Sequence, residues 1–87
     1  MNEEELKQFW SIMADVKDEV SRAKSKYPKF NSLHEGYAIL LEEIEELWDH
    51  TKVKQANRNG AEIEIELMQV IAMAVRCMLD LGPEYKK

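Results

Sequence analysis

Apolar side chains recur at spacings of three and four residues along almost the whole chain, a period that predicts α-helices. The first apolar stripe predicts a helix from about Glu3 to Lys26. It consists of Leu6, Phe9, Met13, Val16, Val20 and Ala23. Asn2 precedes this stripe and Glu5 follows three residues later, which is the spacing of a capping box. No strand pattern or internal repeat appears in the sequence, so we expect an all-α fold.

Turn signals divide the rest of the chain into two further helices. Pro28 disfavours helical geometry in the residue before it, so the first helix should end near Tyr27. Ser32 and Glu35 have the spacing of a second capping box, with the Glu35 side chain reaching back to the cap. We expect the second helix to run from there to about Lys52.

The third predicted helix begins at Asn59 or Gly60 and ends at Gly82-Pro83, because glycine followed by proline is a strong helix stop. Apolar residues cover most of its circumference: Ile63, Leu67, Met68, Val70, Ile71, Ala74, Val75, Met78 and Leu81. A narrow polar stripe remains: Glu62, Glu66, Gln69, Arg76 and Asp80. Such a helix is largely buried, and three helices offer few places to cover so much apolar surface. We therefore infer a partner chain, most simply through a two-fold dimer.

Length and charge restrict the class of protein. The chain has 87 residues, enough for one domain over residues 1–87. A net charge of −5 repels nucleic acid phosphates and argues against a DNA- or RNA-binding protein. The N-terminus is acidic, unlike a signal peptide, and the longest apolar stretch, Val70 to Val75, is too short to span a bilayer. We expect a cytoplasmic protein with no membrane partner.

Carboxylates on the second and third helices are the candidates for chemistry. Glu43 and Glu46 are three residues apart and lie on one flank of an apolar face. Glu62, Glu66 and Gln69 line one side of the third helix, so an antiparallel pairing would bring the two sets together. Grouped carboxylates can hold a hard cation such as Mg²⁺ through oxygen. The alternative is a solvated charged face, because glutamate is a good helix former.

Other site chemistries fit this sequence poorly. Helical di-iron sites use a Glu-x-x-His spacing, and no glutamate lies three residues before His34 or His50. The chain also has no Walker phosphate loop, no Gly-x-Ser-x-Gly nucleophile motif and no paired-cysteine zinc pattern. Of these site chemistries, a magnesium site for phosphate chemistry fits the residues best, and the solvated charged face stays open as the alternative.

The segment HEGYAILLEEIEELW, from His34 to Trp48, resembles the first conserved helix of the MazG-like all-alpha nucleoside triphosphate pyrophosphohydrolases. The signature of that family is Glu-x-x-Glu, a spacer, and then Glu-x-x-Asp. Glu43 and Glu46 match the first pair, and Glu66 matches the first residue of the second pair. The resemblance extends over about Asn31 to Leu81, more than half of the chain.

The resemblance implies hydrolysis of a nucleoside triphosphate to the monophosphate and pyrophosphate, with Mg²⁺ or Mn²⁺ as cofactor. The metal ligands that it implies are Glu43, Glu46, Glu66 and, at the fourth signature position, Gln69. Glu42 or Glu43 would orient the attacking water. The candidate phosphate contacts are Lys52, Lys54, Arg58 and Arg76. Trp48 or Tyr37 would stack on a base or, alternatively, pack in the core. Members of this family form dimers or dimers of dimers, so we expect an oligomeric helical bundle.

Gln69 departs from the signature, which has aspartate at this position. Glutamine offers a metal a neutral carbonyl oxygen but no charge. Asp80 lies on the same stripe about three turns away, too far to replace the missing ligand. An alternative to the enzyme is therefore a non-catalytic helical module that binds nucleotide weakly or serves as an assembly partner.

Overall fold

The computed structural model describes residues 1–86, and these form three α-helices and one short 3₁₀ turn. Helix α1 spans Glu3–Lys26, α2 spans Leu33–Thr51 and α3 spans Gly60–Tyr85. The 3₁₀ turn η1, Gln55–Asn57, lies in the connector between α2 and α3. Residues 1–86 contain no strand, which confirms the predicted all-α class.

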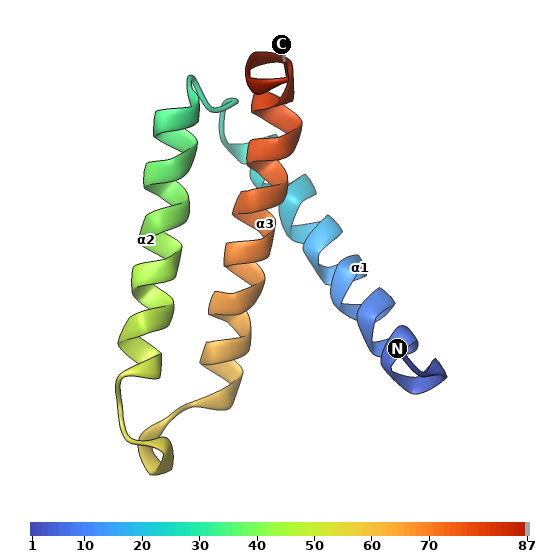
Figure 1. The fold of residues 1–87 in the computed structure, drawn as a ribbon, viewed down its shortest axis with the longest axis vertical. Helices are drawn as coiled ribbons and strands as arrows, with labels where there is room; N and C mark the ends of the chain where they lie inside the picture. Colours follow the sequence, from blue (N-terminus) through green and yellow to red (C-terminus); the bar gives the residue numbers. More distant parts are fainter. Residues whose placement is uncertain (87) are drawn as a thin grey trace.

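Helix α3 lies between the other two helices and packs against both (Figure 1). It forms an antiparallel hairpin with α2, as the candidate site required. Helix α1 packs on α3 with its C-terminal half, and its N-terminal half diverges from the hairpin (Figure 1). The molecule is consequently extended, with dimensions of 44 × 33 × 24 Å.

Side-chain caps begin all three helices, because the first N–H groups of a helix lack partners within it. Asn2 Oδ1 accepts a hydrogen bond from the Glu5 N–H at 2.8 Å, and the reciprocal bond completes the predicted capping box. Ser32 Oγ accepts from the Glu35 N–H at 3.1 Å. The reciprocal half of this second box was predicted wrongly, because the Glu35 carboxylate accepts from the Asn31 N–H instead of from Ser32.

The predicted end of α3 at Gly82-Pro83 is also wrong, because the helix continues to Tyr85. A glycine ends a helix by adopting a left-handed conformation, and no glycine of residues 1–86 has a positive φ angle. Gly82 remains helical and accepts a hydrogen bond from the Lys86 N–H at 3.0 Å. Pro83 removes one N–H from the last turn without stopping it.

The core lies where α1 crosses α3 and where the α1–α2 linker covers that crossing. Its buried apolar members are Val16, Val20, Ala23, Phe30, Ala72, Met73 and Leu81. Asp80 fixes the linker, because its carboxylate accepts hydrogen bonds from the Phe30 N–H at 3.2 Å and from Lys24 Nζ.

Helix α3 is less buried within one chain than its apolar composition predicts. Exposed apolar side chains on this helix include Ile65, Leu67, Ile71, Met78 and Leu79. Others lie on α1 and α2: Leu6, Phe9, Trp10, Ile12, Leu33, Tyr37, Leu41, Ile44 and Trp48. None of the helices formed by residues 1–86 is long and apolar enough to cross a membrane.

Candidate metal centre and adjoining cleft

Three carboxylates meet between α2 and α3. Glu43 and Glu46 occupy successive turns on one flank of α2, and Glu66 faces them from α3. One carboxylate oxygen from each residue lies within 4.8 Å of the others. Glu43 and Glu66 are half-buried and Glu46 is exposed, so the cluster lies at the border between the helix interface and solvent.

The three negative charges oppose one another at this border. Burial raises the pKa of Glu43, and the carboxylates of Glu46, Glu66 and Glu42 raise it further. Burial also raises the pKa of Glu66, and interaction with Glu46 adds to the effect, while the nearby His50 acts against it. The site therefore favours the addition of positive charge, either as protons or as a cation.

One oxygen of this cluster has no partner. Glu66 Oε2 is buried and makes no hydrogen bond to any described residue. An unsatisfied buried carboxylate oxygen is costly, and a bound cation would satisfy it. The donor set fits Mg²⁺ or Mn²⁺, which take a few carboxylate oxygens and retain water or phosphate oxygens as their remaining ligands.

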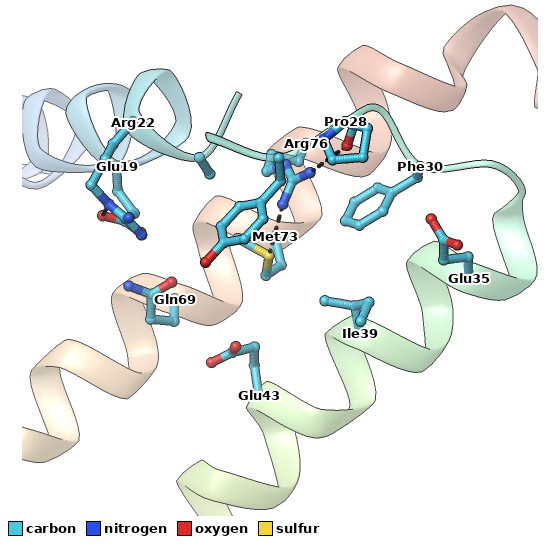
Figure 2. A pocket seen from close by; sticks show the side chains of 12 residues that line it. Glu19, Arg22, Pro28, Phe30, Glu35, Ile39, Glu43, Gln69, Met73 and Arg76 are labelled. Atoms are coloured by element: carbon cyan, nitrogen blue, oxygen red, sulfur yellow. Dashed lines mark hydrogen bonds and ion pairs between the residues drawn. The ribbon is translucent and has the colours of Figure 1, made fainter. Parts of the chain in front are cut away.

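A cleft of about 410 Å³ adjoins the three carboxylates, and Glu43 belongs to both. Its walls come from α1, the α1–α2 linker, α2 and α3. The lining residues are Glu19, Arg22, Ala23, Tyr27, Pro28, Phe30, Glu35, Ile39, Glu43, Gln69, Met73 and Arg76. Figure 2 shows Glu43 and Gln69 projecting from neighbouring helices into the same part of this cleft.

Gln69, the departure from the family signature, lies on the cleft wall between α1 and Glu43 (Figure 2). Hydrogen bonding from Arg22 lowers the pKa of Glu19 against the effect of burial, and the Gln69 amide adds to this lowering. Gln69 therefore lines the cleft together with the charged pair on α1 and with Glu43 of the acidic cluster.

Arg76 is the most deeply buried charged residue of the site, with 4% of its surface exposed. Its guanidinium carbon lies 4.3 Å from the centroid of the Phe30 ring. One terminal nitrogen donates to the Pro28 carbonyl at 3.3 Å, and the other lies 3.8 Å from the Met73 sulfur (Figure 2). Its Nε has no hydrogen-bond partner among the described residues. Of the four cations that the sequence suggests as phosphate contacts, only Arg76 lines the cleft.

The other three cations lie where α2 ends or in the connector that follows it. Lys52 Nζ lies 3.1 Å from Asp49 Oδ1, and Arg58 donates to the Thr51 carbonyl at 2.7 Å. Lys54 is exposed and precedes η1. The structure therefore uses Arg58 to close the connector, which the sequence did not indicate.

The remaining predicted site residues are exposed side chains of α2. Glu42 lies beside Glu43 on the solvent side and contributes to its raised pKa. Trp48 and Tyr37 are exposed and outside the cleft lining, so neither packs in the core of a single chain.

Sequence reasoning missed the part of the cleft formed by α1 and the linker. Tyr27 and Pro28 appeared only as a helix break, and the sequence analysis did not single out Phe30 or the Glu19–Arg22 pair. The available signal was Arg76, a permanent charge on a mostly apolar helix, which needs partners from another segment. No protein-family model, curated protein or solved structure matches this chain.

Proposed function

We propose that this protein is a Mg²⁺-dependent nucleoside triphosphate pyrophosphohydrolase. The observation that carries the proposal is the convergence of Glu43, Glu46 and Glu66 within 4.8 Å, beside a cleft large enough for a nucleotide. The unpartnered Oε2 of Glu66 supports a cation at this position. A cytoplasmic location, where nucleotides and Mg²⁺ are both available, is part of this proposal.

The reaction breaks the bond between the α-phosphorus and the oxygen that bridges to the β-phosphorus. Water supplies the new oxygen, and the products are a nucleoside monophosphate and pyrophosphate. The residues that would hold the cation are Glu43, Glu46 and Glu66, with the Gln69 carbonyl as a neutral candidate. When bound, this cation offsets charge on the phosphates and acidifies a coordinated water.

The carboxylates of the cluster also suit proton transfer. Glu43 is one candidate for orienting the attacking water and accepting its proton, because it lies in the cluster that would hold the cation. Glu42 is the second candidate, placed on the solvent side of Glu43. Lys52, Lys54 and Arg58 are candidate contacts for phosphates that extend out of the site.

The deciding experiment measures pyrophosphate release from a panel of ribo- and deoxyribonucleoside triphosphates, with Mg²⁺, with Mn²⁺ and with EDTA. Wild type should act on at least one nucleotide in a metal-dependent way. Glu46→Gln should lower turnover at least about 100-fold, because a metal site contributes several kcal/mol to the transition state.

Glu45→Gln is the matched control, since Glu45 is an exposed neighbour on α2 outside the cluster. It should retain wild-type turnover. Activity that persists in EDTA, or that survives Glu46→Gln, would contradict the proposal.

A homo-oligomer is part of the proposed function, and the apolar seam of α1 supports it. The positions of this seam alternate at spacings of three and four: Leu6, Phe9, Met13, Val16, Val20 and Ala23. Its last three members are buried against α3, whereas Leu6 and Phe9 are exposed. An apolar stripe with this spacing packs against another helix, so a second copy of the chain is the occupant that we propose.

Surface area supports the same conclusion. The chain exposes 6657 Å², whereas a folded monomer of its mass exposes about 5,300 Å². The excess exceeds the roughly 800 Å² that each partner loses in a typical stable interface. A homodimer, or a dimer of dimers, would cover the α1 seam together with exposed apolar residues of α3.

The second candidate function is a non-catalytic helical module, and Gln69 favours it. Removing one charge from a set of four weakens the binding of a hard divalent cation. Calorimetric titration with Mn²⁺ separates the two functions. Tight binding by wild type supports the enzyme, whereas binding that appears only in Gln69→Asp supports the module.

A further inference from the structure

The cleft beside the acidic cluster has the size and wall chemistry of a small-molecule site. Its volume of about 410 Å³ lies within the usual range for ligand pockets. Half of its lining residues are apolar or aromatic, with Tyr27, Phe30, Ile39 and Met73 as the large members. Such walls suit a flat, weakly polar group more than a phosphate.

Charges around the cleft lead to the same conclusion. Arg22 donates to Glu19 at 3.0 Å, and Glu35 accepts from the Asn31 side chain at 3.0 Å, so both carboxylates already have partners. Glu43 adds a further acidic group at the end nearest the metal centre. The three carboxylates of the lining, from α1 and α2, outnumber its two arginines, Arg22 and Arg76, so phosphates are better placed at the cation than here.

Arg76 provides the second and independent observation. It lines the cleft with 4% of its surface exposed, and none of the carboxylates in residues 1–86 forms an ion pair with it. Asp80, whose pKa its charge helps to lower, is already paired with Lys24. A buried guanidinium without an anion is stabilised by π faces and lone pairs. Phe30 supplies one such face at 4.3 Å, and the unpartnered Nε leaves its hydrogen bonding incomplete.

Gln69 adds hydrogen-bonding capacity where the cleft meets the cluster. Its amide presents a donor and an acceptor side by side, which complements the edge of a nucleobase. Glu43 is shared by the cleft and the cluster, so a ligand in the cleft lies next to the proposed cation. A nucleotide has the required combination of a planar base and a polyphosphate.

We propose that this cleft is the nucleobase subsite, with the exposed ring of Tyr27 as its stacking surface, the Phe30–Arg76 pair behind it, and the Gln69 amide at the base edge. This inference rests on the proposed nucleotide function, but it concerns recognition and not the hydrolytic step. It assigns stacking to Tyr27, at the end of α1, and not to Tyr37 or Trp48 of α2. Because the subsite is acidic, an uncharged nucleoside binds the metal-free protein at least as well as its triphosphate does.

The test uses the full-length ¹⁵N-labelled protein in EDTA, where no turnover is expected. Adenosine, guanosine, cytidine and thymidine are titrated separately, and chemical shifts are followed by NMR. At least one nucleoside should shift the Gln69 side-chain amide and the Arg76 Nε–H signal. Tyr27→Ala should weaken its affinity at least about fivefold, as expected for the loss of a stacking aromatic ring.

Tyr37→Ala is the matched control, since Tyr37 is an exposed tyrosine outside the cleft. It should leave nucleoside affinity unchanged. Tyr27 is itself 48% exposed, so its replacement is not expected to unfold the chain, and circular dichroism checks this. Shifts that map to Tyr37 or Trp48, or equal affinities for Tyr27→Ala and wild type, would overturn the assignment.

Glu46→Gln separates this subsite from the catalytic proposal, because Glu46 belongs to the acidic cluster but does not line the cleft. It should lose Mn²⁺ binding and keep nucleoside binding in EDTA. If wild type binds a nucleoside but releases no pyrophosphate, the subsite proposal stands and the enzyme proposal is wrong. If wild type turns over nucleotide but no nucleoside shifts signals of the cleft, the enzyme proposal stands and the subsite proposal is wrong.

Discussion

Glu46 of α2 and Glu66 of α3 face each other across the helical hairpin, with carboxylate oxygens within 4.8 Å. Among residues 1–86, neither residue forms an ion pair with a basic side chain, and only the charge of the nearby His50 acts to lower the pKa of Glu66. Antiparallel packing of two acidic helix flanks is therefore maintained against electrostatic repulsion. A stored repulsion of this kind has measurable consequences for the metal-free protein.

The first prediction concerns Glu66→Gln. The pKa of Glu66 is raised above its ordinary value of 4.5, so the folded state holds this proton more tightly than the unfolded state does. The stabilisation from this proton is present below pH 4.5 and is lost as the pH rises through the raised folded value. At pH 7.5, a neutral glutamine should therefore raise the melting temperature of the metal-free protein by a few degrees.

The same variant should lose the increase in melting temperature that Mn²⁺ gives to wild type, since a ligand stabilises only the protein that binds it. Differential scanning calorimetry with EDTA or with Mn²⁺ measures both effects. Glu64→Gln, an exposed position on the same helix, is the control and should match wild type in both conditions. A metal-free Glu66→Gln protein less stable than wild type would show that the cluster is not repulsive.

The second prediction concerns Asp80→Asn. The Asp80 side chain is 1% exposed and accepts hydrogen bonds from Lys24 and from the Phe30 N–H. Burial opposes its charge, but these two bonds together with the positive charges of Lys24 and Arg76 outweigh burial and lower its pKa. Hydrogen bonds to a charged group contribute about 1.5–3 kcal/mol, so the variant should lose roughly 2 kcal/mol in the free energy of unfolding.

Urea denaturation measures this loss. Repeating the measurement at lower pH tests the direction of the Asp80 pKa shift independently. A lowered folded pKa means that the stabilisation is present above the ordinary value of 3.8 and is lost as the pH falls below it. The difference between wild type and variant should therefore shrink in acid. Asp49→Asn is the control, because Asp49 forms an ion pair in which its side chain is 66% exposed, and such pairs contribute little.

The third prediction concerns the α1 seam. Phe9 is exposed in a single chain and lies on the half of the seam that α3 does not reach. Phe9→Glu should weaken the homodimer at least about 30-fold, because central aromatic residues contribute about 2 kcal/mol or more to an interface. Light scattering at micromolar concentration should show a dimer or tetramer for wild type and a shift toward monomer for the variant.

Val53→Glu controls for the introduction of charge, since Val53 is an exposed apolar residue of the connector and not of the seam. It should leave the oligomer intact. If wild type were a well-folded monomer at the same concentration, the homo-oligomer inferred from the exposed apolar area would be wrong.

Features of this fold that depend on neighbouring residues were predicted from the sequence more fully than features that depend on tertiary contacts. Helix starts at Asn2, Ser32 and Asn59 were readable because a cap depends on residues within one turn. Helical period and antiparallel packing predicted that Glu43 and Glu46 would meet the set of Glu62, Glu66 and Gln69, and the family resemblance singled out Glu66, which does join them. The role of these residues as metal ligands stays a prediction.

Features that depend on contacts between distant segments were not readable. The end of α3 was predicted wrongly because Gly82 is buried and helical in the folded chain. The glycine-proline pair alone does not indicate that burial. The cleft was missed because its walls combine a linker, one face of α1 and the buried Arg76. The linker residues and Arg76 form one surface only in the folded chain, where α1 crosses α3.

The fourth prediction concerns Gly36, where α2 approaches α3 most closely among the glycines. A Cβ at this position would lie 2.8 Å from Cys77 Sγ and 3.0 Å from Leu81 Cδ1. Both distances are shorter than van der Waals contact, so Gly36→Ala must push the helices apart or displace buried side chains. Overpacking of this kind typically costs about 1–3 kcal/mol, which exceeds the roughly 0.5–1 kcal/mol gained from alanine in a helix.

Gly36→Ala should therefore lower the melting temperature by several degrees, measured by circular dichroism. Gly60→Ala is the matched control, because a Cβ there meets nothing within 4 Å, and it should be neutral or slightly stabilising. The double variant Gly36→Ala with Cys77→Ala should recover part of the loss, since it removes the sulfur that the new methyl group meets first. If Gly36→Ala were as stable as Gly60→Ala, the close approach of α2 to α3 would be wrong, and the spacing of the acidic cluster would need revision with it.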